Sequence, residues 1–531
     1  MKLLSVKIKN FRSIRDAEIS GPINDVWTFI GQNNAGKSSV VHAIRAFYAD
    51  YDVTVEDFCR SCSDQSIEIT LEYQLVDEEF SQLPEFYKLP GNKLRVVKRF
   101  TKEGLKGEFH GFEIKDGVTV EREKEFFGEK NVPIGKLGSI IYIPAVKDLA
   151  EELKKTKSSI FTKLVSRIIS EALTTLPSWN ALVEQAQIFS QDLRSPVKNS
   201  GEGNLNSVHE IEKSLTEMLV SWRLSTQIVV SPPTPEDIVL AGSNLKFISD
   251  DTGQEEDPLT LGSGAQRSIV NSLLLLWARI ESKKAKTDKK KFNGELTLLL
   301  YEEPEALLHY DQEKRLLKNL EEIATSATSQ VLVCTHSPNL ISTKNKALTS
   351  ISRYVKDGTE TKIFHAGDNF LNQLKLEKSV FDFVLWLNPD RNTMFFVDKV
   401  ILVEGPSDKA FLNYLIAENE IETNAYVVDC GMKSNIPRFM QLCSEFGIKH
   451  AVMYDKDDEN KSNHATWNTE IRNTKSPFTL DFKELSPDLE SYIGFPIPSE
   501  RHKKPVEILN QLRSGALATD KVIEFITFIK I

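Results

Sequence analysis

A glycine-rich loop near the N-terminus constrains this chain more than any other feature. The apolar run VWTFIG (26–31) leads into Gly31-x4-Gly36-Lys37-Ser38, and an apolar helical pattern, SSVVHAIRAF, follows directly. Glycines at a strand-to-helix junction let backbone amides turn inward around a phosphate, and the helix N-terminus adds positive potential. The loop therefore predicts a nucleotide-binding α/β domain. A chance glycine loop before a helix is the alternative, and the strand and helix on either side argue against it.

The P-loop pattern assigns roles to its residues. Lys37 is expected to reach the β- and γ-phosphates of ATP, and Ser38 to bind the accompanying Mg²⁺. The other expected ATP contacts are Gly31, Asn33, Asn34, Gly36 and Ser39.

Three later stretches narrow the class of ATPase. LTLLLYEEPEALLH (296–309) reads as a buried strand ending in Glu302 and Glu303, where the first acid helps to hold Mg²⁺ and the second polarises water. LVCTHSPNL (332–340) brings His336 to another strand end, and LGSGAQRSIVNSLLLLW (261–277) is a Gly/Ser turn before a helix. Each has a plainer reading, as solvated acids, a core histidine or an ordinary loop. Their order along the chain is the informative part.

This order, together with IKNFRSI (8–14), resembles the ABC-type ATPases, including SMC-like repair proteins. The resemblance implies a homodimer or higher homo-oligomer in which Ser263 and Gly264 cap the γ-phosphate bound by the partner. It also implies that Glu303 orients water and that His336 senses the γ-phosphate. Two departures are an acid one methylene longer than the usual aspartate, at Glu302, and LGSGAQ in place of LSGGQ.

Two stretches between the P-loop and the signature carry apolar residues at helical spacing, DLAEELKKTKSSIFTKLVSRIISEALTTL and VHEIEKSLTEMLVSWRL. Heptads are not sustained over several repeats, so a long coiled coil is not expected. A compact helical insert that contributes to dimerisation fits this region better.

The C-terminal part places acids after predicted strands. ILVEGPSDKAFLNYLI (401–416) contains Glu404 and Asp408, and AVMYDKDDEN (451–460) contains Asp455 and Asp457. Strand carboxyl ends carry the sites of α/β folds, and carboxylate oxygens suit Mg²⁺ or Mn²⁺. Two such metals can activate a water and stabilise the leaving oxygen at a phosphodiester. The alternative is a generic α/β domain with acidic loops.

Glu404 followed by Asp455-x-Asp457 resembles the Toprim domain, and its pairing with an ABC-type ATPase resembles the OLD (overcoming lysogenization defect) family of ATP-dependent nucleases. The match implies that Glu404 and Asp408 serve one metal, and Asp455 and Asp457 the other or a shared one. Further family acids fall at Asp488 and Glu490. The family also has a late lysine that stabilises the transition-state phosphate. Lys504 is the first candidate for this role and Lys503 the second.

The expected fold is α/β, an ABC/SMC-like P-loop ATPase with a helical dimerisation insert and a C-terminal Toprim domain. The expected boundaries are 1–147 and 231–395 for the ATPase, 148–230 for the insert and 396–531 for Toprim. The expected function is an ATP-hydrolysing, metal-dependent DNA endonuclease of bacterial anti-phage defence. It acts alone or with a partner, either a helicase-like protein or a retron reverse transcriptase with its DNA–RNA product. The alternatives are an ATP-driven DNA clamp or sensor with a non-cleaving Toprim domain, and a topoisomerase-like enzyme.

Composition bounds the environment and the partners. No apolar run approaches the roughly 20 residues that span a bilayer, and five cysteines with no second pair after Cys59 and Cys62 fit a reducing compartment. A cytoplasmic protein without a membrane partner is therefore expected. The net charge of −10 argues against a generally basic nucleic-acid binder, so DNA contact depends on local runs. Two such runs are 283–291 and 501–504.

Overall fold

The structure is a computed structural model of all 531 residues. It describes the chain except for 22–25, 61–65, 129–135, 146–147, 155, 157–158, 169–176, 193–196, 199–203, 206, 220–223, 226–241, 244, 251, 283–291, 342–346, 368–369, 371–388, 462 and 497–502. The basic run 283–291 and the residues 501–502 thus lie outside the described residues. Two compact units are formed, Met1–Ala145 with Ala278–Ile531, and Val146–Trp277.

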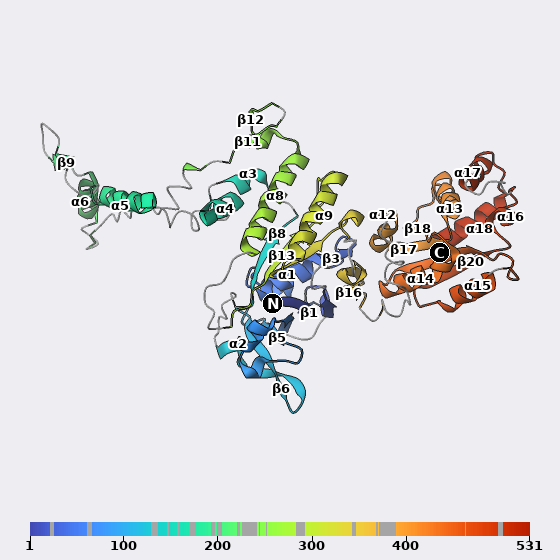
Figure 1. The fold of residues 1–531 in the computed structure, drawn as a ribbon, viewed down its shortest axis with the longest axis horizontal. Helices are drawn as coiled ribbons and strands as arrows, with labels where there is room; N and C mark the ends of the chain where they lie inside the picture. Colours follow the sequence, from blue (N-terminus) through green and yellow to red (C-terminus); the bar gives the residue numbers. More distant parts are fainter. Residues whose placement is uncertain are drawn as a thin grey trace. The chain divides into compact units, whose positions relative to one another are not determined.

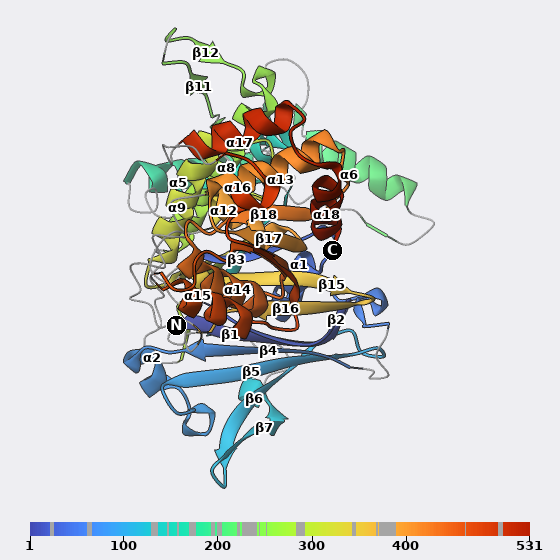
Figure 2. The same cartoon turned by 90° about the vertical axis from the view of Figure 1, so that its right-hand side faces the viewer.

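The N-terminal part of the first unit contains an antiparallel sheet (Figure 2). Its strand order is β2-β1-β4-β5-β6-β7. The strands are β1 (Lys2–Phe11), β2 (Ile14–Ser20), β4 (Ser66–Gln74), β5 (Lys93–Thr101), β6 (Glu108–Lys115) and β7 (Val118–Glu125). Alternate residues of β1 and β4 are buried, as expected for a sheet with one face on the core.

A second, mainly parallel sheet carries the P-loop. Its order is β16-β15-β3-β14-β13-β8, and only the β15–β16 pair is antiparallel. The strands are β3 (Val26–Gly31), β8 (Ser139–Ile143), β13 (Thr297–Glu302), β14 (Ser329–Cys334), β15 (Ile351–Asp357) and β16 (Glu360–His365). Every residue of β3, β13 and β14 is buried, which explains their continuous apolar sequence. Because β14 lies between β3 and β13, the carboxyl ends of these three strands meet.

The α-helices described in this N-terminal part of the first unit are α1 (Lys37–Phe47), α2 (Asp77–Gln82) and α9 (Tyr310–Ala324). The helix α1 starts at the end of the P-loop and buries Val40, Val41 and Ile44 in the core shared with β1 and β4.

The C-terminal domain is built on a parallel sheet of order β18-β17-β19-β20 (Figure 1). Its strands are β17 (Lys399–Val403), β18 (Ala425–Asp429), β19 (Lys449–Asp455) and β20 (Thr479–Leu485). Its helices are α12 (Pro389–Asn392), α13 (Pro406–Glu418), α14 (Ile436–Glu445), α15 (His464–Asn473), α16 (Leu489–Ile493), α17 (Lys504–Arg513) and α18 (Thr519–Lys530).

Alternating residues of β17 enter different cores, so helices cover both faces of this sheet. Val400 and Leu402 pack in one cluster with Phe439 of α14. Ile401 and Val403 pack in the other with the helices α13 and α18. This two-sided burial is why the strand reads as the continuous run KVILV.

Arg353 of β15 connects the P-loop sheet to the C-terminal domain. Its side chain is 3% exposed and donates four hydrogen bonds to main-chain carbonyl oxygens. The acceptors are Phe395 (3.0 Å), Phe446 (3.0 Å), Gly447 (3.1 Å) and Val397 (2.7 Å). Arg353 also lies beside Ile30 of β3 in the sheet register.

The second unit contains helices and short hairpins. Its elements are α3 (Leu149–Leu153), α4 (Ile160–Ile168), α5 (Pro177–Asp192), β9 (Val197–Lys198), β10 (Asn204–Leu205), α6 (Ser207–Met218), β11 (Phe247–Ile248) and β12 (Glu255–Glu256). The helix α8 (Ser263–Ser282) begins in this unit and continues into the first. The boundaries at 147, 230 and 395 stay a prediction.

The sheets confirm the predicted α/β class, with a P-loop sheet followed by a separate parallel sheet in the C-terminal domain. Across the described ranges, no helix combines the length and the apolar character that crossing a bilayer requires.

Candidate functional site

The P-loop requires glycine where the chain turns between β3 and α1. Gly36 has φ +100°, and a Cβ atom there would lie 2.4 Å from Thr361 Oγ1. Gly31 has φ +144°, and its Cβ would lie 2.3 Å from the carbonyl oxygen of Tyr354. Both positions therefore exclude larger residues, because β15 and β16 pack closely against the loop.

The loop opens on a cavity of about 360 Å³ that lies entirely within the first unit. The structure brings eight predicted ATP-site residues into it: Asn33, Asn34, Gly36, Lys37, Ser38, Ser39, Glu303 and His336. Arg12, Ser13 and Lys356 also line it and were not predicted. Arg12 and Ser13 belong to IKNFRSI (8–14), which supported the family resemblance but gave no role to these two residues.

Lys37 points back onto its own loop. Its ammonium nitrogen donates to the carbonyl oxygens of Gly31 (2.8 Å) and Gln32 (2.9 Å). Burial lowers the pKa of Lys37, and the neighbouring acids Glu303 and Glu305 oppose that shift. The lysine is thus held at the cavity, where a phosphate group would replace these weaker acceptors.

Glu302 ends β13 with one oxygen held and one left without a partner. Tyr142, in the edge strand β8, donates to Glu302 Oε2 at 2.7 Å. The other oxygen, Oε1, is buried and accepts no hydrogen bond from any residue that the structure describes. A buried carboxylate oxygen without a partner is costly, so this atom fits a metal ligand. The tyrosine also limits the extra reach that a glutamate has over an aspartate.

Glu303 and His336 lie just beyond the carboxyl ends of the adjacent strands β13 and β14. The His336 Nε2 to Glu303 Oε1 distance is 3.9 Å. Burial and the charge of Lys37 lower the pKa of His336, so its neutral form is favoured. The backbone N–H of His336 donates to Glu305 at 2.6 Å. The position of His336 is therefore fixed by its backbone, and its ring is left for the cavity.

Ser263 and Gly264 open helix α8 in the second unit. They are not among the residues that line the P-loop cavity of the same chain. Their predicted role in a partner's ATP site stays a prediction.

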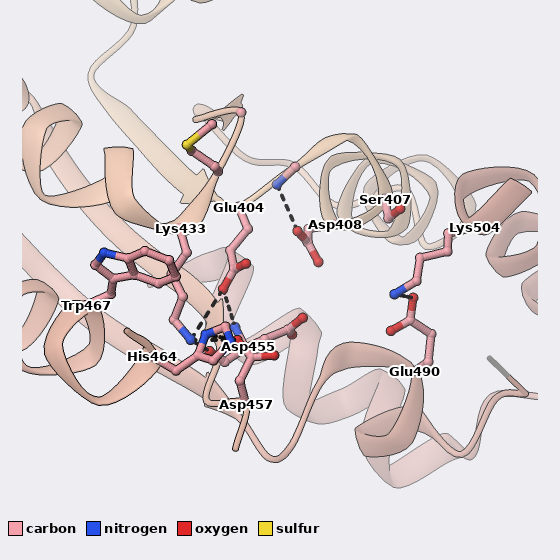
Figure 3. A pocket seen from close by; sticks show the side chains of 13 residues that line it. Glu404, Ser407, Asp408, Lys433, Asp455, Asp457, His464, Trp467, Glu490 and Lys504 are labelled. Atoms are coloured by element: carbon pink, nitrogen blue, oxygen red, sulfur yellow. Dashed lines mark hydrogen bonds and ion pairs between the residues drawn. The ribbon is translucent and has the colours of Figure 1, made fainter. Parts of the chain in front are cut away.

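A second cavity, of about 350 Å³, lies at the carboxyl end of the parallel C-terminal sheet (Figure 3). Six predicted site residues line it: Glu404, Asp408, Asp455, Asp457, Glu490 and Lys504. The remaining lining residues are Gly405, Ser407, Gly431, Met432, Lys433, His464 and Trp467. Glu404 and Glu490 are far apart in the sequence. They line the same cavity because the parallel strands end at one edge of the sheet.

Main-chain donors orient three of these carboxylates. Glu404 follows β17 and accepts from the N–H of Asp455 at 2.9 Å. Asp408, in the first turn of α13, accepts from the N–H of Gly405 at 3.0 Å. Asp455, at the end of β19, accepts from the N–H of Leu489 at 2.9 Å.

The same three carboxyl groups resist ionisation. Burial, followed by repulsion from Asp408, raises the pKa of Glu404 to about 8. Burial raises the pKa of Asp408 to about 7, with Glu490 adding to the shift. Burial and then Asp408 and Glu404 raise the pKa of Asp455 to about 9. Acids that repel one another in this way favour a bound cation.

The carboxylates do not yet converge on one point. Over the parts of the chain that the structure describes, no three His, Cys, Asp or Glu side chains are close enough to hold an ion by themselves. Mg²⁺ usually keeps several waters and takes one or two carboxylates from a protein, so a spread set of acids around a cavity still fits it.

The two late lysines, Lys503 and Lys504, differ in their position relative to the cavity. Lys504 Nζ lies 2.8 Å from Glu490 Oε1 inside the cavity, whereas Lys503 is exposed and does not line it. Asp488 does not line the cavity either, because its carboxylate caps α16 by accepting from the N–H of Ser491 at 2.8 Å. The structure therefore brings one of the two late lysines and one of the two late acids into the site.

None of the seven remaining lining residues was predicted from the sequence, and three of them have side chains that contact a site acid or each other: Lys433, His464 and Trp467. Lys433 lies just after Gly431, in the turn that follows β18. His464 Nδ1 lies 3.1 Å from Asp457 Oδ2, and its ring meets Trp467 edge-on at 5.4 Å. Nothing in the local pattern around His464 marked it as part of the site.

Comparisons with known proteins match both parts. Residues 1–125 and 105–341 match the family "AAA ATPase domain", and residues 395–457 match "Overcoming lysogenization defect protein-like, TOPRIM domain". An "OLD nuclease" of Thermus scotoductus (strain ATCC 700910 / SA-01) is 22% identical over 487 residues, covering 86% of this chain and 82% of that protein. "Endonuclease GajA" of Bacillus cereus (strain VD045) is 21% identical over 486 residues, covering 87% and 76%.

Among solved structures, an SMC head bound to the C-terminal winged-helix domain of ScpA aligns with a TM-score of 0.40 and 14% identity. It covers 71% of this chain and 100% of the head.

Proposed function

This chain belongs to the family with an AAA ATPase domain and joins to it an OLD-like TOPRIM domain, and on that premise we propose that it is an ATP-hydrolysing, divalent-metal-dependent DNA endonuclease. One observation carries the proposal. Glu404, Asp408 and Asp455 share a cavity at a parallel-sheet edge, and Lys504 lies in the same cavity. The names of the two relatives, a nuclease and an endonuclease, support it.

The cleavage site divides its work between acids and a lysine. Glu404, Asp408, Asp455 and Asp457 would hold Mg²⁺ or Mn²⁺, and the bound metal would supply an activated water and stabilise the leaving oxygen. Lys504 would balance the negative charge that develops on the phosphate, because it is held toward the cavity by Glu490. Asp488 is a helix cap in this scheme, and Lys504 is preferred to Lys503.

The ATP site follows the same logic. Lys37 would bind the β- and γ-phosphates, and Ser38 with the free oxygen of Glu302 would hold Mg²⁺. Glu303 would orient the attacking water, with His336 beside it at the γ-phosphate. On the family resemblance, Ser263 and Gly264 are assigned to the site of a second copy. A homodimer that forms with ATP is therefore expected.

Arg353 links the P-loop sheet to the C-terminal domain within the first unit, and we propose that ATP gates access to the cleavage site. A Lys37→Ala variant tests this idea. If it cut DNA with the same dependence on nucleotide as the wild type, gating would be ruled out.

One experiment tests the nuclease. Supercoiled plasmid is incubated with the full chain, Mg²⁺ or Mn²⁺, and either ATP or none. Two variants remove one acid each from the same run of acids: Asp455→Ala in the cavity, and Asp458→Ala, which is exposed and pairs with Lys461. Nicked or linear DNA from the wild type and Asp458→Ala, but not from Asp455→Ala, supports the proposal.

Other products decide between the alternatives. Relaxed closed circles would indicate a topoisomerase-like enzyme. Intact plasmid in every condition, with ATP-dependent DNA binding, would replace the nuclease with an ATP-driven clamp or sensor.

The biological setting extends the proposal beyond the site. We assign the enzyme to anti-phage defence in a bacterial cytoplasm, acting alone or with a helicase-like protein or a retron reverse transcriptase and its DNA–RNA product. The family resemblance is the support. Phage plating on cells that express the wild type or Asp455→Ala tests the assignment, and equal plating on both would contradict it.

A further inference from the structure

Lys433 places a positive charge inside the acidic cavity without facing the solvent. Its side chain is 4% exposed. Its ammonium nitrogen lies 2.8 Å from Asp457 Oδ2 and 4.0 Å from Glu404 Oε1, and it also donates to the main-chain oxygen of Asp455. Figure 3 shows this group on one side of the cavity and the Glu490–Lys504 pair on the other.

The backbone that carries Lys433 is tightly held. The N–H of Cys430 donates to Val403 (3.0 Å), and the N–H of Gly431 donates to Asp429 Oδ1 (2.6 Å). Asn435 closes the turn by donating to the carbonyl oxygen of Cys430 at 2.9 Å. Since the turn is fixed at both ends, the lysine reaches across the end of β17 from a defined point.

The segment that Lys433 binds is irregular. Asp457 has φ +55°, a left-handed conformation that a residue with a Cβ adopts only when its surroundings hold it. On the far side, the N–H of Asp457 donates to Pro487 at 2.7 Å and that of Lys456 donates to Leu485 at 2.6 Å. On the side that faces the cavity, the Lys433 ammonium group binds this segment through Asp457 Oδ2 and the main-chain oxygen of Asp455.

Lys433 and Lys504 differ in what they offer a substrate. The Lys504 side chain is 26% exposed, whereas Lys433 is nearly covered and directed at main-chain oxygens and at Asp457. A buried ammonium group with its donors engaged by protein does not contact a phosphate. Its effect must act through the acids it holds.

We propose that Lys433 is a positioning residue, whose ammonium group keeps Asp455 and Asp457 in the arrangement that receives a divalent cation. The inference rests on the proposed nuclease function, because it concerns the same acids. Without an internal cation, adjacent carboxylates at the end of β19 repel each other and the strand end relaxes. Groups that orient metal ligands are worth roughly 10–100-fold in metal affinity.

The test measures Mn²⁺ binding to the full chain by titration calorimetry, with Lys433→Met as the uncharged variant of similar length. Lys456→Met is the matched control, because Lys456 lies between the two acids in sequence while its charge acts on Glu484. Asp455→Asn defines the loss of the site. Circular dichroism checks folding, and Lys433→Gln replaces Lys433→Met if the latter does not fold. The rate of plasmid cleavage is followed against Mn²⁺ concentration in parallel.

The expected result is Mn²⁺ binding roughly 10–100-fold weaker in Lys433→Met and unchanged in Lys456→Met. Lys433→Arg, which keeps the charge, is expected to recover part of the affinity. Cleavage by Lys433→Met should approach the wild-type rate at saturating Mn²⁺. Equal or tighter Mn²⁺ binding would overturn the proposal, and so would cleavage that stays absent at full occupancy, because Lys433 would then act on the substrate. If the wild type itself bound no Mn²⁺, the proposed function would fail first.

Discussion

Raising the pH of the metal-free protein should destabilise it, because of the three buried carboxyl groups of the C-terminal cavity. The pKa values of Glu404, Asp408 and Asp455 are raised to about 8, 7 and 9 in the folded chain. In the unfolded chain these groups ionise near pH 4. Between these limits the folded state binds more protons than the unfolded state, so the free energy of unfolding falls as the pH rises.

The window from pH 6.5 to 8 covers most of this effect. Burial lowers the pKa of His42, His336, His365 and His450, so these groups make a smaller opposite contribution, which is confined to the lower end of the window where the unfolded histidines still release protons. Burial also lowers the pKa of Lys2 and Lys98 to about 8, and their opposite contribution grows above that pH. Within the window each retained proton costs about 1.4 kcal/mol per pH unit, or about 2 kcal/mol in total.

The acids repel one another, so their contributions do not add, and one to two retained protons is the realistic range. The expected loss is therefore about 2–4 kcal/mol, which lowers the melting temperature of a 531-residue chain by roughly 2–4 °C.

Differential scanning calorimetry in EDTA at pH 6.5 and 8 measures the difference. Asp455→Asn should flatten the dependence, since it removes the group with the highest raised pKa. Saturating Mn²⁺ should abolish it, since the ion replaces the protons. A melting temperature that is constant or rises across the window in the wild type, or a slope that Asp455→Asn leaves unchanged, would refute the reasoning.

Three further predictions follow from single contacts. Arg353→Met leaves four buried carbonyl oxygens without their donor, so calorimetry should show a loss of roughly 3–5 kcal/mol, whereas an unchanged transition would mean that the contact is replaced. Tyr142→Phe frees one oxygen of Glu302, so we expect ATP hydrolysis to slow roughly tenfold with little change in ATP affinity; equal rates at limiting Mg²⁺ would contradict this. Lys504→Ala should abolish plasmid cleavage while Lys503→Ala retains it, and the reverse result would exchange the two assignments.

The sequence predicts a functional residue best where that residue directly follows a strand. A short apolar run followed by glycine or acid is a local pattern, and Lys37, Glu303 and Asp455 all follow such runs. Parallel strands then bring these ends to one edge, so two separate sets of residues each met in a cavity. The α/β class followed from the same patterns.

Residues that depend on strand order were not accessible. Lys433 meets Asp455 because β18 and β19 lie on either side of β17, and no spacing along the chain encodes that order. Tyr142 reaches Glu302 from the edge strand β8, again through pairing between distant segments. Asp488 shows the converse problem, because an aspartate before a helix looks the same whether it caps the helix or binds a metal.

Substitution of Arg353 and substitution of the residues that it contacts have unequal effects on this junction. All four of its hydrogen-bond acceptors are main-chain oxygens, which every amino acid provides. The side chains of Phe395, Val397 and Phe446 can therefore change without removing a hydrogen bond directly, whereas Gly447 has φ +62° and a Cβ there would lie 2.5 Å from the Phe364 ring. On the donor side, a single residue provides all four hydrogen bonds, and lysine cannot replace a planar group that bonds in four directions. Drift at the other three acceptor positions is thus tolerated at this junction, whereas a change at Arg353 would have to be compensated by rebuilding it.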